Sequence, residues 1–224
     1  MDYQFQWRPV IQALPQLLEA SLVTLQVSVL SMGLGLLMGL VLYFFRKSPI
    51  LPLRAFATTW IEVARNTPSL FQIFIFYWGL GEFGIFLSPY VSVVAALSFN
   101  CAGYMAETYR GGFAAVPKGQ NMAARTLGMT AWQSLRYVEL PQVLRAIYHP
   151  MTNQFTWIIL ASSLGMLAGL RELSGETQYF NSRTFRTFEF FMAAAVIYYV
   201  ITKIALLVLK AIGWNLFKAE RAAK

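Results

Sequence analysis

The sequence is poor in the residues that build disulfides, metal centres and catalytic dyads. Its 224 residues include one cysteine and one histidine. The single thiol, Cys101, excludes an intrachain disulfide and any Cys-rich zinc or redox motif. His149 stands in the stretch IYHPM, which offers no nucleophile or orienting partner for catalysis. The Gly-rich phosphate loop that ends in Lys and Ser or Thr is also missing, so we expect no ATP hydrolysis and no enzyme activity from this chain.

Charged residues are scarce as well. They make up 12% of the chain, against about a quarter in a typical soluble domain, whereas 57% of the residues are hydrophobic. This balance indicates a membrane protein. Five apolar runs, at about residues 21–45, 56–80, 91–109, 141–170 and 188–209, each supply the roughly 20 residues that a helix needs to cross a bilayer. None alternates as a barrel strand would. We therefore predict an all-α membrane protein with five transmembrane helices in a single domain, residues 1–224.

The few charges are distributed unevenly between the runs. Basic residues follow the first, third and fifth runs: Arg46, Lys47 and Arg54; Arg110, Lys118, Arg125, Arg136 and Arg145; Lys210, Lys218, Arg221 and Lys224. The loops on the other side, among which we count residues 171–189, hold few or balanced charges. Because excess Lys and Arg mark cytoplasmic loops, we predict that the N-terminus lies outside and the C-terminus in the cytoplasm. The net charge of +8 then needs no nucleic acid to explain it.

A polar segment at about residues 117–140 separates the third and fourth runs and would lie in the cytoplasm. Its stretch NMAARTL favours a short helix with Asn121 as the cap. Gly128 suits the left-handed residue that ends a helix, and Thr130 with Gln133 fits a capping box that starts a second helix. Pro141 fits the first position of the following span. We predict a bent helical hairpin.

The hairpin could lie against a protein or against lipid. Ala123 and Ala124 would give its first helix a smooth surface that fits a groove of another protein. The alternative is an amphipathic helix that rests on the membrane. We favour the protein partner, because the helix is only weakly apolar and a Gly-capped bend has no use on a flat membrane.

The hairpin resembles a known signature. Ala123-Ala124, three residues, Gly128, nine residues and Val138-Glu139-Leu140-Pro141 are similar to the EAA motif of ATP-binding-cassette importer permeases. The stretches ARNTPSLFQIFIFYWGLG, SFNCAGYMAETYRGGFAAVPKGQ and LPQVLRAIYHPMTNQF resemble further runs of the polar-amino-acid subfamily, the histidine, glutamine, glutamate and arginine permease type. The resemblance extends over most of the chain.

This resemblance implies the type I importer permease fold and a set of partners. Two permease subunits would form the pore. Two cytoplasmic ATPase subunits, with ATP and Mg²⁺ bound to them, would drive it, and an extracytoplasmic binding protein would deliver a polar amino acid or a derivative. The chain itself would bind no cofactor and no metal, and would lie among the lipids of a bacterial cytoplasmic (inner) membrane. The hairpin would be the coupling helix, docked on an ATPase through Gly119, Gln120, Met122, Ala123, Ala124, Arg125, Leu127, Gly128, Leu140 and Pro141.

Three positions depart from the family pattern. Met122 stands where the motif has a glutamate, and Asn66 stands where a glycine is usual. The run Leu160-Ala161-Ser162-Ser163-Leu164 replaces one that commonly holds a Lys-Asp pair. From these losses we hypothesise that the chain pairs with a second, non-identical permease subunit that has a more typical signature.

Charged residues inside the second run identify a candidate substrate pathway. A charge at mid-membrane costs about 2.5–3.5 kcal/mol and needs a partner or a cavity. Glu62 and Arg65 lie three apart on one helix face, and Pro68 can open the backbone beside them. They either face the pathway or form a structural ion pair, and the sequence favours neither. The pathway candidates are Glu62, Arg65, Asn66, Gln72, Asn100, Tyr104, Asn153, Ser162 and Ser163.

Two further pairs have plainer readings. Glu107 with Arg110, at the cytoplasmic end of the third run, fits an anchor or a gate better than a ligand site. Gly35 and Gly39 in the first run form a small-xxx-small pattern, which reflects close helix packing more often than a specific dimer.

Other functions stay open at this point. A secondary transporter would need an inverted repeat of its own, which five unequal spans do not offer. The chain could also be a structural subunit of a different membrane complex. Co-purification with an ATPase and an external binding protein would separate these alternatives from an importer.

Overall fold

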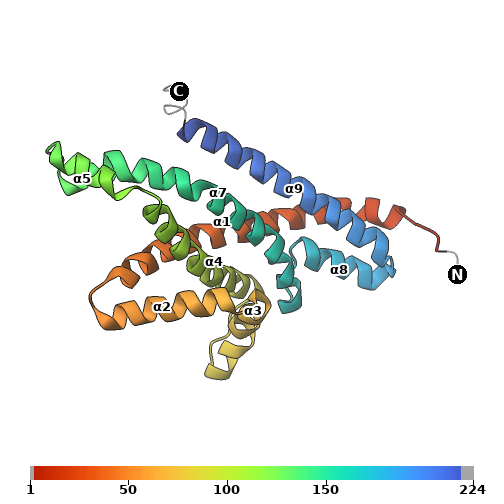
Figure 1. Ribbon diagram of the computed structural model, residues 1–224. Helices are drawn as coiled ribbons and strands as arrows, with labels where there is room; N and C mark the ends of the chain where they lie inside the picture. Colours follow the sequence, from red (N-terminus) through yellow and green to blue (C-terminus); the bar gives the residue numbers. More distant parts are fainter. Residues whose placement is uncertain (1–2, 218–224) are drawn as a thin grey trace.

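The computed structural model describes residues 3–217, and this part of the chain is helical without strands (Figure 1). The α-helices are α1 (Arg8–Lys47), α2 (Leu51–Asn66), α3 (Ser69–Tyr77), α4 (Pro89–Ala114), α5 (Lys118–Thr126), α6 (Ala131–Ser134), α7 (Leu140–Ala161), α8 (Leu173–Thr184) and α9 (Thr187–Leu216). Two 3-10 helices, η1 (Gly79–Phe83) and η3 (Ser162–Ala168), follow α3 and α7, and a π-helical turn, η2 (Leu135–Glu139), precedes α7. The predicted all-α class is confirmed.

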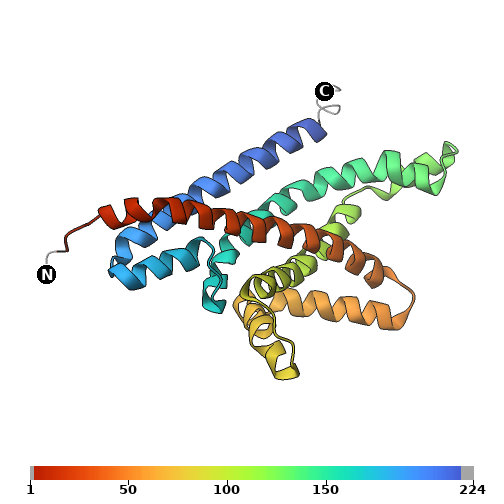
Figure 2. The same cartoon turned by 180° about the vertical axis from the view of Figure 1, so that it is seen from behind.

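Helix α4 lies in the middle of the arrangement. It packs mainly against α1, which runs along the length of the molecule, and also against α2, α3 and α7 (Figures 1 and 2). Helices α8 and α9 pack against each other and against α1. The hairpin that contains α5 projects at the end of the molecule opposite the N-terminus, and the last turns of α9 lie toward that same end (Figure 1).

Two of the described helices, α1 and α9, are each long and apolar enough to cross a membrane. A third span is counted if Ala131–Ala168 and α8, which meet at an angle of 45°, are taken together. The predicted number of five transmembrane helices therefore stays a prediction. The boundaries also differ from expectation, because α1 begins at Arg8, the second run is divided between α2 and α3, and the fourth run ends in η3.

Helix α8 contradicts the prediction of a loop at residues 171–189. Its cap is Glu172, whose fully buried carboxylate accepts the N–H of Gly175 at 2.9 Å. The same carboxylate accepts hydrogen bonds from the hydroxyls of Thr24 in α1 (3.1 Å) and Tyr198 in α9 (2.6 Å). Partners far away in the sequence thus hold α8 in place, which no local pattern could reveal.

The glycine pair of the first run allows α1 and α4 to touch. A Cβ atom on Gly35 would stand 2.4 Å from the sulfur of Cys101, and one on Gly39 would stand 2.6 Å from Cβ of Met105. Both distances are shorter than any ordinary contact, so only glycine fits at either position. The pair serves close packing within the chain, as the sequence favoured.

Candidate functional site

The bend of the predicted hairpin is built by local hydrogen bonds. Helix α5 ends at Thr126 and is followed by Leu127 and Gly128, and the φ of Gly128, +87°, is left-handed and suits glycine. The second arm starts with the predicted capping box: Gln133 N–H donates to the hydroxyl of Thr130 at 3.2 Å, and Thr130 N–H donates to the side chain of Gln133 at 2.8 Å. Both predictions are confirmed.

Asn121 has a different position from the predicted one. Helix α5 begins at Lys118 after Pro117, so Asn121 lies inside the helix and is not its cap. Its side-chain amide instead reaches the second arm, where it donates to the hydroxyl of Ser134 at 3.2 Å and to the carboxylate of Glu139. The two arms of the hairpin are therefore tied together by side chains as well as by the bend.

The two alanines of the signature do not share one surface. Ala123 is exposed, whereas Ala124 is buried. This corrects the prediction that both form a smooth outer surface, because Ala124 belongs to the inside of the hairpin.

The outer surface of the hairpin is apolar and exposed. Met122 is 65% exposed, Leu127 is 81% exposed, and Trp132 and Tyr137 are exposed to a similar degree. Of the other predicted coupling residues, Gly119, Gln120, Arg125 and Gly128 are exposed, Leu140 is partly so and Pro141 is half-buried. Exposed apolar side chains gathered in this way are typical of a protein or membrane contact. Sequence reasoning did not select Trp132 or Tyr137, although their size and place in a polar segment were visible.

The second arm continues into α7 without a gap. The turn of α6 passes through the π-helical turn into α7 at Leu140, whose N–H bonds the carbonyl of Leu135. Pro141 occupies the start of α7, as predicted. Near the first arm, a Cβ atom on Gly112 of α4 would stand 2.3 Å from Cγ2 of Ile147 in α7. A displacement of the hairpin would therefore reach α4 and α7 together.

Glu107 of α4 connects this helix to the end of α1. Its carboxylate accepts the Nε–H of Arg110 at 2.7 Å and also a hydrogen bond from Arg46 at the end of α1. The predicted pair with Arg110 is thus present, and Arg46 is an additional partner that joins α1 to α4.

The exposed charges of α2 do not pair with each other. In the described part of the chain no ion pair joins Glu62 and Arg65; the carboxylate of Glu62 instead accepts the amide of Asn66 at 2.9 Å. The guanidinium of Arg65 lies over the ring of Tyr104 in α4, 5.6 Å from its centroid. All four side chains are exposed. The alternative of a structural ion pair is therefore wrong for this structure.

Helix α7 extends this exposed surface. The ring of Trp157 lies 6.5 Å from that of Tyr104, centroid to centroid, and Asn153 lies one turn before Trp157 on the same helix face. We call the set Glu62, Arg65, Asn66, Tyr104, Asn153 and Trp157 the polar face. Sequence reasoning missed Trp157, because a tryptophan in an apolar run also fits a lipid contact.

Gln72 and Asn100 are placed differently from the polar face. Both are buried, and both donate to the carbonyl of Ala64 at 3.0 Å, while the amide of Asn100 also bonds the carbonyl oxygen of the Gln72 side chain. Pro68 interrupts the helix between α2 and α3 and leaves this carbonyl without a helical partner. The two amides satisfy the break, which corrects the prediction that they line an open pathway.

The two predicted serines bond to their own helix. The hydroxyl of Ser162 is buried and donates to the carbonyl of Ile159 at 2.8 Å, so it lines no open surface. Ser163 donates to the carbonyl of Leu160 at 2.6 Å and borders a cavity of about 520 Å³ between η3 and α9, together with Tyr199 and Lys203. Of these serines, only Ser163 keeps a place beside an open space.

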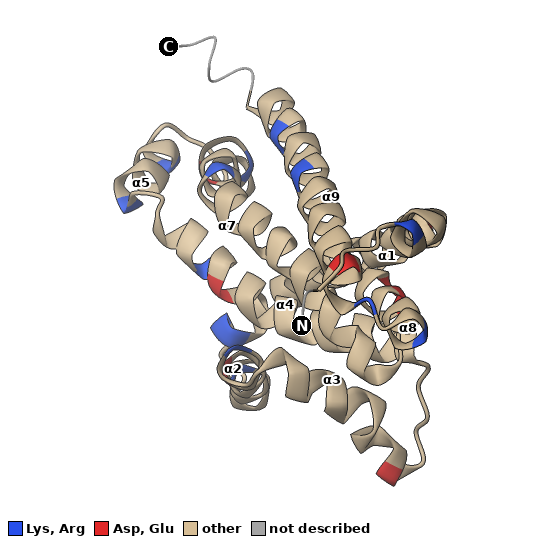
Figure 3. Cartoon of the chain, turned by 90° about the vertical axis from the view of Figure 1, so that its right-hand side faces the viewer, with Lys and Arg blue, Asp and Glu red and all other residues tan. Residues whose placement is uncertain are grey.

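Charged residues are spread over several helices. Figure 3 shows basic residues on α5, α7 and α9 and also on α1, α2 and α8, and an acidic residue beyond α3. Among the described residues, no group of three or more His, Cys, Asp or Glu is placed to hold a metal ion.

Comparison with known proteins gives a consistent result over almost the whole chain. Residues 12–214 match the family described as "Binding-protein-dependent transport system inner membrane component". The chain is 33% identical over 209 residues to the glutamine transport system permease protein GlnP of Escherichia coli K12. The matched region covers 92% of this chain and 95% of GlnP. It is also 33% identical over 204 residues to the probable amino-acid ABC transporter permease protein YckA of Bacillus subtilis, covering 91% and 90%.

Solved structures show the same fold. A crystal structure of an amino acid ABC transporter with histidines has a chain that superimposes with a TM-score of 0.87 at 33% identity, over 94% of this chain and 98% of that one. The MetNI methionine ABC transporter, in an inward-facing conformation, has a chain that superimposes with a TM-score of 0.64 at 18% identity, over 92% and 98%, and shares the fold alone.

Proposed function

We propose that this chain, which belongs to the family of binding-protein-dependent transport system inner membrane components, is the permease subunit of an ATP-driven importer of polar amino acids. The observation that carries this proposal is the exposed hairpin, continuous with α7, in a chain that matches amino-acid permeases over nine-tenths of its length. The chain is a transport subunit, not an enzyme. ATP and Mg²⁺ belong to a separate ATPase in this assignment, because the sequence has no phosphate-binding loop.

The hairpin is the part that an ATPase would move. Its arms are joined by the bend at Gly128 and by the side chain of Asn121, so it can be displaced as one body. The second arm continues into α7, and α4 packs on α7 at Gly112. A tilt imposed on the hairpin would therefore turn α4 and α7 together, which is the rigid-body route to alternating access.

We infer the orientation and the partners of the chain from its charges and from its family. The hairpin and the C-terminal turns of α9 lie at one end of the molecule and the N-terminus at the other (Figure 1), which supports a cytoplasmic hairpin and an external N-terminus. The assembly would hold two ATPase subunits, a second permease subunit and an extracytoplasmic binding protein. Exposed Met122 in place of the motif's glutamate supports a non-identical second subunit that supplies the missing polar contact.

The polar face is the proposed pathway for the amino acid. Charged groups at membrane depth are tolerated where they meet water or another subunit, and Glu62 and Arg65 are both exposed. The guanidinium of Arg65 can bind a carboxylate through two parallel N–H donors, and Glu62 can accept the ammonium group. The rings of Tyr104 and Trp157 form an apolar border beside them.

The coupling role can be tested at Leu127. Burying a leucine contributes about 1.5–3 kcal/mol, so Leu127→Ser should weaken ATPase binding by roughly ten- to hundredfold. The matched control is Phe83→Ser, which removes an apolar side chain of equal exposure, 81%, in η1. We expect the ATPase to co-purify with the Phe83 variant and not with the Leu127 variant. Unchanged co-purification and amino-acid uptake in Leu127→Ser would overturn the proposal.

A further inference from the structure

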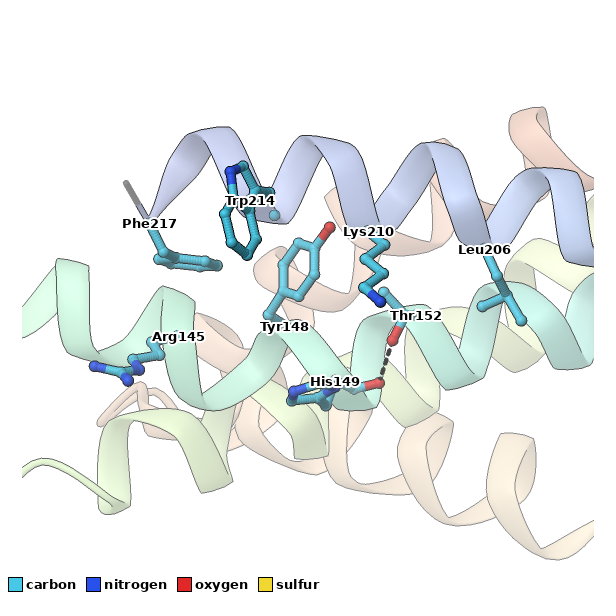
Figure 4. A pocket seen from close by; sticks show the side chains of 9 residues that line it. Arg145, Tyr148, His149, Thr152, Leu206, Lys210, Trp214 and Phe217 are labelled. Atoms are coloured by element: carbon cyan, nitrogen blue, oxygen red, sulfur yellow. Dashed lines mark hydrogen bonds between the residues drawn. The ribbon is translucent and has the colours of Figure 1, made fainter. Parts of the chain in front are cut away.

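A cavity of about 630 Å³ separates the first turns of α7 from the last turns of α9 (Figure 4). Three of its lining residues can carry positive charge, Arg145, His149 and Lys210, and three are aromatic, Tyr148, Trp214 and Phe217. Among residues 3–217, no acidic residue lines it. In Figure 4 the side chain of Lys210 points from α9 toward His149 and Thr152 of α7, while the three aromatic rings gather toward the C-terminal end of α9. Basic and aromatic residues combined in this way are typical of the membrane–water boundary.

The walls of the cavity are held at a defined separation. The hydroxyl of Tyr148 donates to the carbonyl of Leu209, so α7 and α9 are joined at this point. The ring of Tyr148 lies against Gly213, where a Cβ atom would stand 2.7 Å from it. Lys210 is exposed, and no ion pair holds it within residues 3–217. Its ammonium group is therefore available to an anion from outside the chain.

A second, apolar groove adjoins this cavity. It has a volume of about 570 Å³ and lies between α1, α7 and α9, with Val29, Met32, Phe155 and Val208 among its walls. Tyr148 and Thr152 line both spaces, so the two lie next to each other. A molecule that occupied both would need an anionic head for the cavity and a hydrocarbon chain for the groove.

We propose that this composite site binds an anionic phospholipid of the cytoplasmic leaflet, with its phosphodiester in the cavity and an acyl chain in the groove. The inference rests on the orientation proposed above, which places this end of α9 at the cytoplasmic surface, where anionic lipids attract basic residues. Helix α9 also has the exposed apolar surface that lipid contact requires. Only 11% of the residues in its most apolar 18-residue stretch are buried within the molecule.

Native mass spectrometry of the purified transporter can count the bound lipid after exchange from phosphatidylcholine into mixtures with phosphatidylglycerol. Loss of one cation near an anionic headgroup lowers affinity about fivefold, so Lys210→Gln should retain about fivefold less phosphatidylglycerol. The matched control is Lys203→Gln, on the same helix but outside both spaces, and it should retain the wild-type amount.

A second variant tests the groove independently of charge. Gly33 lines the groove, and a Cβ atom there meets nothing within 4 Å, so Gly33→Phe should fill the space of the acyl chain and lower retention without a change in charge. Equal retention by all variants would overturn the proposal. Displacement of the lipid by inorganic phosphate alone would also overturn it, because it would indicate a free-ion site. So would cross-linking of a cysteine at Leu206 to the second permease subunit, because it would indicate a protein contact on this face. Failure of the Leu127 variant to bind the ATPase is a separate readout, so the two proposals can fail independently.

Discussion

Replacement of Gly39 by alanine tests the packing that positions the hairpin. The added Cβ would stand 2.6 Å from Cβ of Met105 and 2.9 Å from the carbonyl oxygen of Ala102. Carbon atoms pack at about 3.5–4.0 Å, so α1 and α4 would have to separate by roughly 1 Å at this point. A gap of that size forfeits about a quarter to a half of the contact energy of the atoms beside it. Overpacking by one methyl group costs about 1–3 kcal/mol.

The matched control is Gly33→Ala on the same helix. A Cβ there meets nothing within 4 Å. Alanine is about 1 kcal/mol better than glycine in a helix, and because both variants share this gain, the difference between them isolates the packing cost. For a chain of this size each kcal/mol shifts Tm by about 2–4 °C. Gly39→Ala should therefore unfold roughly 2–12 °C below Gly33→Ala.

The assay can use the single thiol. Cys101 is buried where α1 meets α4, so a thiol-reactive dye reports the opening of this interface during heating in detergent. If Cys101 reacts with the dye at the same temperature in Gly39→Ala and Gly33→Ala, to within about 1 °C, then α1 and α4 are not in the close contact that the glycine pair would allow.

Two further predictions concern hydrogen bonds at the helix break and at the hairpin. Gln72→Leu has a side chain of similar size but removes a hydrogen-bond partner of the Ala64 carbonyl and of the Asn100 amide. We expect the free energy of unfolding, measured by denaturant titration, to fall by about 1–3 kcal/mol. An unchanged free energy of unfolding would mean that other groups satisfy the Ala64 carbonyl. Thr130→Ala removes the capping box, should destabilise the second arm by about 1 kcal/mol, and should speed amide exchange at residues 131–134, whereas the exposed Thr126→Ala outside the box should leave that exchange unchanged.

The sequence by itself determined the features that depend on composition and on neighbours within a few residues. A low charge content and long apolar runs indicated a helical membrane protein. The bend at Gly128 and the capping box of Thr130 and Gln133 were predictable because each bond joins residues at most five positions apart. The EAA-like spacing identified the family for the same reason, since the whole motif lies within one short segment. Five transmembrane helices remain a prediction.

Only the tertiary structure decided which side chains meet across the fold. Glu172 accepts hydrogen bonds from Thr24 and Tyr198, which are far away in the sequence. These bonds hold the capped helix α8 where the sequence predicted a loop. The sequence predicted that Gln72 and Asn100 line the pathway. In the structure both side-chain amides bond the carbonyl of Ala64, which has no helical partner because the helix is broken at Pro68. Hydrophobicity and local spacing indicate which polar side chains are costly to bury in a membrane. They do not indicate which group forms the hydrogen bond that offsets this cost. The packing of the whole chain decides that, because it brings together residues that are far apart in the sequence.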